Sequence, residues 1–300
     1  MISIDLGSNT FRCITYDCKK RTFGSDFERI VKTADKMHES GRISDKAVER
    51  ILEAIKEADR QFDFKAHCVR AVTTAAMRMA RNAQDVLKRL SAEGGIDFQI
   101  IDADREAYFS VTSVKHRLRQ LNISANSFVL VDMGGGSTEV IFVSEGKVHT
   151  QSFPIGIVTV AQQCETPNDV RTLLSTLLIP VKNYVRDYYQ QNKKPQTFIN
   201  TAGTPTTIAA FLQGMTYQTY DVSKINGYIL TQAACQKALE GLILLDEETR
   251  AAYVGVGRET LIVAGVVIVQ MFYELLGFDE SIVIDDGVRE GVAIDYCIDK

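Results

Sequence analysis

Val131-Asp132-Met133-Gly134-Gly135-Gly136-Ser137-Thr138-Glu139 follows an apolar run that begins at Phe128 and leads into a second apolar run that ends at Ser144. This order is typical of two strands joined by a glycine turn. The chain opens in the same way with Asp5-Leu6-Gly7-Ser8-Asn9-Thr10. In each stretch an Asp closes a buried strand, glycine opens the turn and a hydroxyl residue opens the next strand. We interpret the two stretches as copies of an internal duplication, which predicts a domain boundary near residue 123.

Strand and helix patterns alternate on both sides of this boundary. Before it, the patterns predict strands at 2–6, 11–16, 66–72 and 98–101 and helices from Ser44 past Ile55, at 75–90 and at 104–121. After it, they predict strands at 128–132, 139–144, 147–153, 197–202 and 281–284 and helices at 168–190, 232–245, 258–276 and from about 288. We therefore expect two α/β domains, 1–122 and 123–300, each with a mixed sheet flanked by helices, and a cleft between them. An alternative for the C-terminal helix is that it packs back on the first domain.

The composition narrows the class of protein. A length of 300 residues and 45% hydrophobic content suffice for two cores. The formal net charge of -4 argues against a nucleic-acid partner, because coating nucleic acid requires a dominant basic face. The six cysteines lack a close pair and predict reduced thiols. The apolar run 261–272 is too short to span a bilayer, so we expect a buried helix, no membrane partner and, without a signal-peptide pattern, a cytoplasmic protein.

The two glycine turns predict anion-binding loops. Glycine lets the backbone approach a ligand and adopt positive φ, so that several N–H groups can point at one anion. Hydroxyl residues stand in or beside both turns, and Asp5 and Asp132 can hold a hydrated divalent cation or orient water against a phosphate. The alternative for one turn alone is a tight hairpin without a ligand. The repeated Asp and the repeated hydroxyl residue favour the ligand-binding interpretation.

Beyond the turns, the sequence resembles the exopolyphosphatase and guanosine pentaphosphate phosphatase (Ppx/GppA) family of the actin-like ATPase superfamily. The resemblance covers the whole chain and is carried by these segments: 4–12, 73–78, 105–107, 131–139, 201–204 and 287–291. It implies two ribonuclease-H-like domains and release of orthophosphate from inorganic polyphosphate or from guanosine pentaphosphate. The implied partners are inorganic polyphosphate or guanosine pentaphosphate and tetraphosphate, with a homodimer possible.

The resemblance also implies a set of reacting groups. Glu106 matches the family's general base, and its place in the first turn of a helix favours an ionised carboxylate. Asp132 and Glu139 match carboxylates that place metal and water. Together with Asp5 they form the expected metal ligands, with Mg²⁺ or another divalent cation as the cofactor. The alternatives are a helix-terminal carboxylate without chemistry for Glu106 and an exposed strand residue for Glu139.

Phosphate oxygens need N–H, hydroxyl and guanidinium donors. We expect them from the following residues: Gly7, Ser8, Asn9, Thr10, Arg12, Arg78, Gly134, Gly135, Gly136, Ser137, Thr138 and Arg289. Basic residues such as Lys65, Arg70, Arg81, Lys88 and Arg89 either line a channel for a long polyanion or form a solvated face. The Thr201–Pro205 turn lies where superfamily members receive a nucleotide, and an unliganded strand-to-helix connection is the alternative.

The chain departs from the family pattern beside the expected base. The family usually has Gly-x-Glu-Glu-Ala-Arg, whereas Arg105 replaces one acid and Tyr108 replaces the arginine. Two other functions stay open. The two loops and their hydroxyl residues also suit a nucleotide-dependent kinase or ATPase of the same superfamily, and the altered residues Arg105 and Tyr108 suit a non-catalytic sensor of polyphosphate or guanosine alarmones. The sequence does not distinguish polyphosphate from guanosine pentaphosphate as the preferred substrate.

Overall fold

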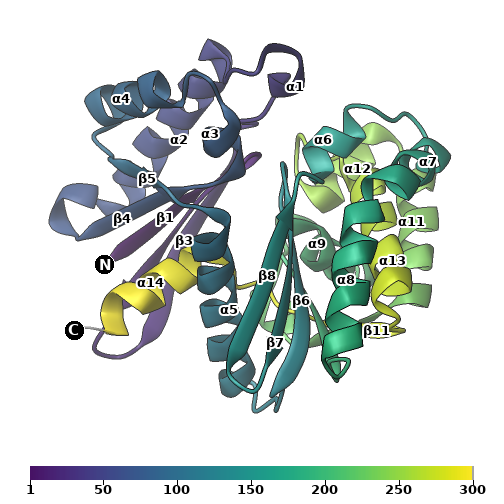
Figure 1. Ribbon diagram of the computed structural model, residues 1–300. Coiled ribbons are helices and arrows are strands. Elements are labelled where there is room, and N and C mark those ends of the chain that lie inside the picture. Colours follow the sequence, from purple (N-terminus) through teal and green to yellow (C-terminus); the bar gives the residue numbers. More distant parts are fainter. Residues whose placement is uncertain (299–300) are drawn as a thin grey trace. The chain divides into compact units, whose positions relative to one another are not determined.

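The computed structural model describes residues 1–298, which form two compact units (Figure 1). Unit 1 contains Met1–Ser113 and the residues from Asp286 on, and unit 2 contains Val114–Asp285. The change between units lies within one continuous helix, α5 (Ala103–Gln120), rather than at residue 123. The last helix, α14 (Val288–Ile298), belongs to unit 1. This is the arrangement in which the C-terminal helix packs back on the first domain.

Unit 1 is built on a mixed five-stranded sheet of order β3-β2-β1-β4-β5. Its strands are β1 (Ile2–Leu6), β2 (Thr10–Asp17), β3 (Thr22–Ile30), β4 (Val69–Thr73) and β5 (Phe98–Ile100). β1 pairs antiparallel with β2 and parallel with β4. Besides α14 and the first part of α5, the helical segments of unit 1 are α1 (Met37–Ser40), α2 (Asp45–Phe62), η1 (Phe64–Ala66), α3 (Ala75–Met79) and α4 (Ala83–Gly94).

The alternation of side chains along β1 assigns the two faces of this sheet. Ile2, Ile4 and Leu6 are fully buried in the core that α2 and α4 cover. Ser3 and Asp5 therefore face the opposite side, because successive strand residues point to opposite faces. On that side α14, yellow in Figure 1, packs against β1 and β2. This arrangement places Asp5 on the face that α14 covers.

Unit 2 repeats the plan with a mixed six-stranded sheet of order β10-β11-β9-β6-β7-β8. Its strands are β6 (Ser127–Met133), β7 (Thr138–Ser144), β8 (Lys147–Phe153), β9 (Thr197–Thr201), β10 (Tyr228–Thr231) and β11 (Glu280–Val283). Its helices, besides the second part of α5, are α6 (Ile157–Ala161), α7 (Pro167–Leu177), α8 (Ile179–Gln191), α9 (Gly203–Leu212), α10 (Val222–Ile225), α11 (Gln232–Leu244), α12 (Glu247–Val254) and α13 (Ile262–Leu276).

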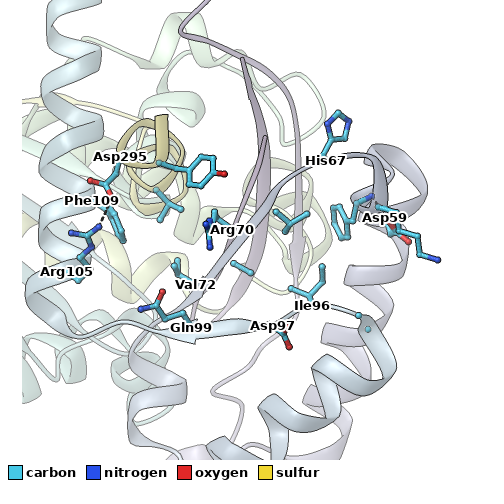
Figure 2. A pocket seen from close by; sticks show the side chains of 18 residues that line it. Asp59, His67, Arg70, Val72, Ile96, Asp97, Gln99, Arg105, Phe109 and Asp295 are labelled. Atoms are coloured by element: carbon cyan, nitrogen blue, oxygen red, sulfur yellow. Dashed lines mark hydrogen bonds and ion pairs between the residues drawn. The ribbon is translucent and has the colours of Figure 1, made fainter. Parts of the chain in front are cut away.

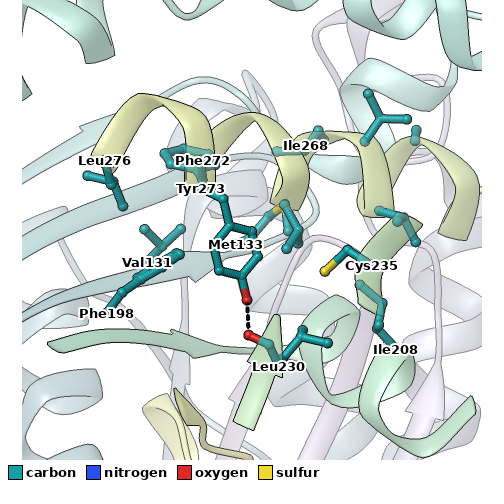
Figure 3. Close-up of a cluster of buried hydrophobic side chains, with 14 of the residues drawn as sticks. Val131, Met133, Phe198, Ile208, Leu230, Cys235, Ile268, Phe272, Tyr273 and Leu276 are labelled. Atoms are coloured by element: carbon teal, nitrogen blue, oxygen red, sulfur yellow. Dashed lines mark hydrogen bonds between the residues drawn. The ribbon is translucent and has the colours of Figure 1, made fainter. Parts of the chain in front are cut away.

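The core of unit 2 packs β6 and β9 against α13 (Figure 3). Phe198, Phe272 and Tyr273 are almost completely buried there, and the Tyr273 hydroxyl donates to the Leu230 carbonyl oxygen at 2.6 Å. α13 contains most of the apolar run 261–272, which confirms the prediction of a buried helix. Within the described residues, every helix is too short or too polar to cross a membrane.

Three local predictions were wrong. The helix expected at 168–190 is divided into α7 and α8 by the junction at Leu178, close to Pro180. The helix expected at 75–90 is interrupted because Ala80 is extended and the Asn82 side chain bonds the backbone of Ile43. Cys18 and Cys297 form a disulfide, although reduced thiols were expected. The cysteines lie at the two ends of the chain, so their spacing does not indicate a pair.

The duplication is visible in strand register. Asp5 of β1 lies opposite Arg12 of β2, and Asp132 of β6 lies opposite Glu139 of β7. In both pairs the two residues are separated by the same number of positions and by the glycine turn. β1 also pairs parallel with β4 as β6 does with β9. The two copies therefore agree in register as well as in sequence.

Candidate functional site

In unit 1, three segments that carry predicted site residues follow neighbouring parallel strands. β1 leads into the turn at Gly7, β4 leads into α3 with Arg78, and β5 leads into α5 with Glu106. The carboxyl ends of parallel strands lie at the same edge of a sheet, which is where α/β folds commonly bind ligands. The topology thus brings these three segments to one edge of unit 1.

The first glycine turn is held by the chain that follows β3. The Gly7 N–H donates to the Thr10 carbonyl oxygen at 3.0 Å, and the Ala34 N–H donates to the Ser8 carbonyl oxygen at 2.8 Å. Because a trans peptide directs its C=O and N–H groups in opposite directions, the Asn9 N–H points away from Ala34. The turn thus directs a backbone donor to the side opposite its support.

The second glycine turn repeats this arrangement in unit 2. The Gly134 N–H donates to the Ser137 carbonyl oxygen at 2.9 Å, and the Val158 N–H donates to the Gly135 carbonyl oxygen at 2.9 Å. The Gly136 N–H accordingly points away from Val158. Asn9 and Gly136 occupy equivalent positions of the two copies, so the same backbone donor is oriented in the same way twice.

Close approach of the backbone, rather than positive φ, explains Gly134 and Gly156, whereas a Cβ on Gly7 would make only an ordinary contact. Neither Gly7 nor Gly134 has a left-handed backbone, so that part of the sequence argument was wrong for them. A Cβ on Gly134 would lie 3.2 Å from the Ser137 carbonyl oxygen. A Cβ on Gly156, at the start of α6, would lie 2.2 Å from the Gly135 carbonyl oxygen. Sequence reasoning missed Gly156, and its position just after β8 is the signal that could have found it.

The second turn carries a pair of carboxylates. Asp132 and Glu139 lie directly opposite each other, so their side chains share one face of the sheet. Glu139 is buried, and its Oε1 accepts from the Ser137 hydroxyl at 2.9 Å and from the Ser152 hydroxyl at 2.7 Å. Glu139 is thus a held carboxylate rather than an exposed strand residue. Ser152 was missed by sequence reasoning, because only the β7–β8 register brings it to Glu139.

The hydroxyl residues beside the turns differ in their surroundings. Ser8 and Ser137 are buried, with exposed fractions of 5% and 6%. Thr138 is fully buried, and its hydroxyl donates to the Ile155 carbonyl oxygen at 2.5 Å. The Thr138 side chain is therefore engaged inside unit 2, where it fixes the segment that leads to α6.

Glu106 lies in the first turn of α5 and is 9% exposed. The Asp102 carboxylate accepts from the Arg105 N–H at 2.8 Å, which caps this helix terminus. The Arg78 Nη1 donates to Glu106 Oε2 at 2.6 Å and to the Ile101 carbonyl oxygen at 2.9 Å. A guanidinium has five N–H groups, and both contacts use one nitrogen of Arg78. Arg78 can therefore hold Glu106 and still reach an anion.

The two other predicted arginines are also paired with carboxylates in unit 1. The Arg12 Nε donates to Glu28 at 2.8 Å. The Arg289 Nε donates to Glu290 at 2.5 Å, and its Nη1 lies 3.5 Å from Asp26. Glu290 is buried and also accepts from the Gly287 N–H at 2.8 Å. These contacts fix where the two guanidinium groups lie at the α14 face.

The turn after β9 has a strained backbone. Ala202 has a φ of 72°, although it is not glycine, and α9 begins at the next residue. Such conformations cost about 1–3 kcal/mol and are concentrated at functional sites. Sequence analysis left open whether this turn contacts a ligand, and the conformation of Ala202 favours a functional role.

The acidic side chains can be compared with the ligands that a divalent metal ion takes. Among residues 1–298, no three His, Cys, Asp or Glu side chains are grouped as a metal site. Mg²⁺ usually takes one or two carboxylates together with water and substrate phosphates, so it does not need such a group. Asp132 and Glu139, which are neighbours on the unit 2 sheet, fit this donor set. Asp5, the third expected ligand, lies in unit 1.

A cavity of about 660 Å³ lies elsewhere on unit 1 (Figure 2). Lys65 and Arg70 line it, whereas Arg81, Lys88 and Arg89 do not. The residues predicted to bind phosphate are likewise absent from its lining. The basic residues from this part of the sequence therefore do not form one continuous channel through the cavity.

Comparisons with known proteins agree with this architecture. The model of the Ppx/GppA phosphatase family matches residues 25–298. Exopolyphosphatase 2 of Mycobacterium tuberculosis is 26% identical over 319 aligned positions, which cover 97% of each chain. A crystal structure of an Aquifex aeolicus Ppx/GppA family member is 28% identical, with a TM-score of 0.75 over 99% of this chain and 97% of that one.

A structure of an exopolyphosphatase from Cytophaga hutchinsonii has a TM-score of 0.85 at 21% identity, over 99% of this chain and 97% of that one, and supports the two-domain fold alone. The family match spans most of the sequence and includes the segments at Glu106, Glu139 and Arg289. The chain belongs to the Ppx/GppA phosphatase family.

Proposed function

We propose that this protein is a phosphohydrolase that releases terminal orthophosphate from inorganic polyphosphate. The observation that carries the proposal is the buried Glu106 carboxylate, held by Arg78 at the edge of the unit 1 sheet where the first glycine turn also lies. The relatives named exopolyphosphatase support the choice of substrate.

In the proposed reaction, Glu106 accepts a proton from water as the water oxygen attacks the terminal phosphorus. The bond between phosphorus and the bridging oxygen breaks, and the shortened polymer leaves with that oxygen. Phosphate oxygens interact with the guanidinium groups of Arg78, Arg12 and Arg289. The N–H groups of the turns orient the same phosphate oxygens. Asp132 and Glu139 are the residues that would hold Mg²⁺, which supplies charge neutralisation for the phosphate when bound.

The 5′ γ-phosphate of guanosine pentaphosphate is a second candidate substrate. It is joined by the same phosphoanhydride chemistry, and it is the second substrate that the resemblance to the Ppx/GppA family implies. Measuring phosphate release from both compounds, with ATP as a third substrate, separates these assignments from the kinase or ATPase interpretation. A protein that binds polyphosphate but releases no phosphate with Mg²⁺ present would instead be a sensor.

The Glu106→Gln variant tests the proposed base directly, because it retains size but cannot accept the proton. We expect phosphate release to fall at least 1,000-fold while polyphosphate binding stays within about threefold. Glu93→Gln is the matched control, since Glu93 is an exposed carboxylate that pairs with Arg89 in α4. Normal turnover by Glu106→Gln would exclude Glu106 as the base.

A further inference from the structure

The two residues that depart from the family pattern contact one carboxylate. Arg105 and Tyr108 lie on α5 on either side of Glu106 in sequence. The Arg105 Nη2 lies 2.5 Å from Asp295 Oδ2, and the Tyr108 hydroxyl lies 2.8 Å from Asp295 Oδ1. Each Asp295 oxygen thus receives one donor from α5. Figure 2 shows the Arg105 guanidinium directed at the Asp295 carboxylate, beside the ring of Phe109.

Aromatic rings fix the orientation of the guanidinium. The Arg105 Cζ lies 4.7 Å from the ring centroid of Tyr108 and 4.5 Å from that of Phe109. A planar guanidinium stacks on such rings while donating to a carboxylate at its edge. The hydrogen bond to Asp295, together with burial, raises the pKa of Tyr108. We call Arg105, Tyr108 and Asp295 the Asp295 clamp.

Asp295 is fixed because its helix is anchored at several places in unit 1. α14 packs on β1 and β2, and Cys297 is bonded to Cys18 near the end of β2. α14 also contacts α5 closely, because a Cβ on Gly291 would lie 2.1 Å from the Phe109 carbonyl oxygen. The buried cluster of Val72, Ile101, Phe109, Val288 and Val292 fills the space around this crossing. The clamp therefore ties the start of α5 to a helix that has little freedom to move.

We propose that Asp295 is a positioning residue, which acts through Arg105 and Tyr108 to hold the first two turns of α5 and thereby Glu106 at Arg78. The inference rests on the proposed function in taking Glu106 as the base. Residues at i and i+3 share a helix face, so Arg105 and Tyr108 reach α14 together, whereas Glu106 is directed to Arg78. Asp295 itself contacts neither Glu106 nor Arg78 through any hydrogen bond or ion pair that involves the described residues.

A merely structural ion pair would behave differently from a positioning device. The Arg105 side chain is 47% exposed, and exposed ion pairs contribute little to global stability. Loss of such a pair leaves turnover unchanged. Loss of a positioning contact lowers kcat, because small displacements of a catalytic group are costly to rate, while substrate affinity is retained.

The test compares Asp295→Ala, Tyr108→Phe, Arg105→Met and the Arg105→Met/Asp295→Ala double variant in steady-state phosphate release from polyphosphate. We expect Asp295→Ala to lower kcat about tenfold and Tyr108→Phe about threefold, with KM within twofold of the unaltered protein. The kcat of the double variant should lie within about twofold of the kcat of Asp295→Ala, because both changes remove the same interaction. The Arg89→Met/Glu93→Gln variant removes an exposed pair of unit 1 and serves as the control.

Amide hydrogen exchange supplies a readout that does not depend on activity. We expect exchange at residues 104–110 to be at least fivefold faster in Asp295→Ala, with α13 of unit 2 unchanged. Unchanged kcat, or multiplicative rate losses in the double variant, or unchanged exchange at 104–110 would overturn the proposal. If Asp295→Ala does not fold, Tyr108→Phe decides it by the same criteria. If exchange at 104–110 is faster in Asp295→Ala but the unaltered protein releases no phosphate, the Asp295 clamp is supported and the proposed function is wrong.

Discussion

The guanidinium of Arg78 donates to the carboxylate of Glu106 over 2.6 Å, and both side chains are largely removed from solvent. Arg78 enters from α3 and Glu106 from α5, so the contact joins the segments that follow β4 and β5. The same Arg78 nitrogen also donates to the Ile101 carbonyl oxygen. The pair thus sets where a carboxylate stands at the edge of the sheet.

Replacement of Arg78 by Met should affect both turnover and stability. We expect kcat/KM for polyphosphate to fall about 100-fold, because a phosphate donor is lost and Glu106 is no longer held. The free energy of unfolding should fall by about 1–3 kcal/mol, since a mostly buried carboxylate loses its partner. Phosphate-release kinetics and urea unfolding measure the two effects. Arg89→Met is the control, and an equal loss of activity in that variant would contradict a specific role for Arg78.

Ser152 offers a test of the carboxylates in unit 2. Ser152→Ala removes one of the donors to Glu139 Oε1, and we expect kcat to fall about tenfold, with more Mg²⁺ needed for half-maximal rate. Thr150→Val is a matched control two residues earlier on β8, because the Thr150 hydroxyl forms no hydrogen bond with the residues that the structure describes. Magnesium titrations of phosphate release check this prediction. Identical curves for the two variants would show that Ser152 does not support Glu139.

Gly156 tests the support of the second turn. An Ala side chain there would clash with the backbone of Gly135, so we expect Gly156→Ala to lower the unfolding free energy by about 1–3 kcal/mol and to weaken polyphosphate binding. Gly214→Ala is the control in unit 2, because its surroundings are open and only its φ of 71° opposes the change. That variant should lose about 1 kcal/mol and keep normal binding. Equilibrium unfolding and a binding isotherm distinguish the two.

Buried thiols predict an alkaline loss of stability. Burial raises the pKa of Cys13 and of Cys235 to about 12, above the ordinary thiol value of 9.0. Between these values the unfolded chain releases the proton and the folded chain keeps it, so stability is full below about pH 9 and falls as pH rises toward 12. Urea unfolding at pH 8, 9, 10 and 11 should reveal this slope.

The Cys235→Ala variant should have a shallower slope than the unaltered protein over the same pH range, because one of the two groups no longer titrates. Cys68→Ala removes an exposed thiol and should leave the slope unchanged. Equal slopes in all three proteins would show that the buried thiols do not control the alkaline transition.

The sequence predicts what depends on local pattern and on repetition. The turns at Gly7 and Gly134 are recognisable because each follows an apolar run that ends in Asp, and the repeat of that order predicts the duplicated sheet. Ser152 and Asp295 could not be found in this way. Ser152 reaches Glu139 through strand register, and Asp295 lies 190 residues after Arg105 and meets it because α14 packs on the unit 1 sheet. Long-range pairing of this kind leaves no spacing signal.

The order of elements along the chain has a consequence for biosynthesis. Unit 2 is inserted between the first part of unit 1 and α14, and α14 covers the sheet face on which Asp5 lies. On the ribosome, the whole of unit 2 must be translated before α14 emerges. Until then, the sheet face of unit 1 on which Asp5 lies stays uncovered. Arg289 lies in α14 and is therefore also translated after unit 2. A prematurely terminated polypeptide would therefore lack both the cover and the arginine.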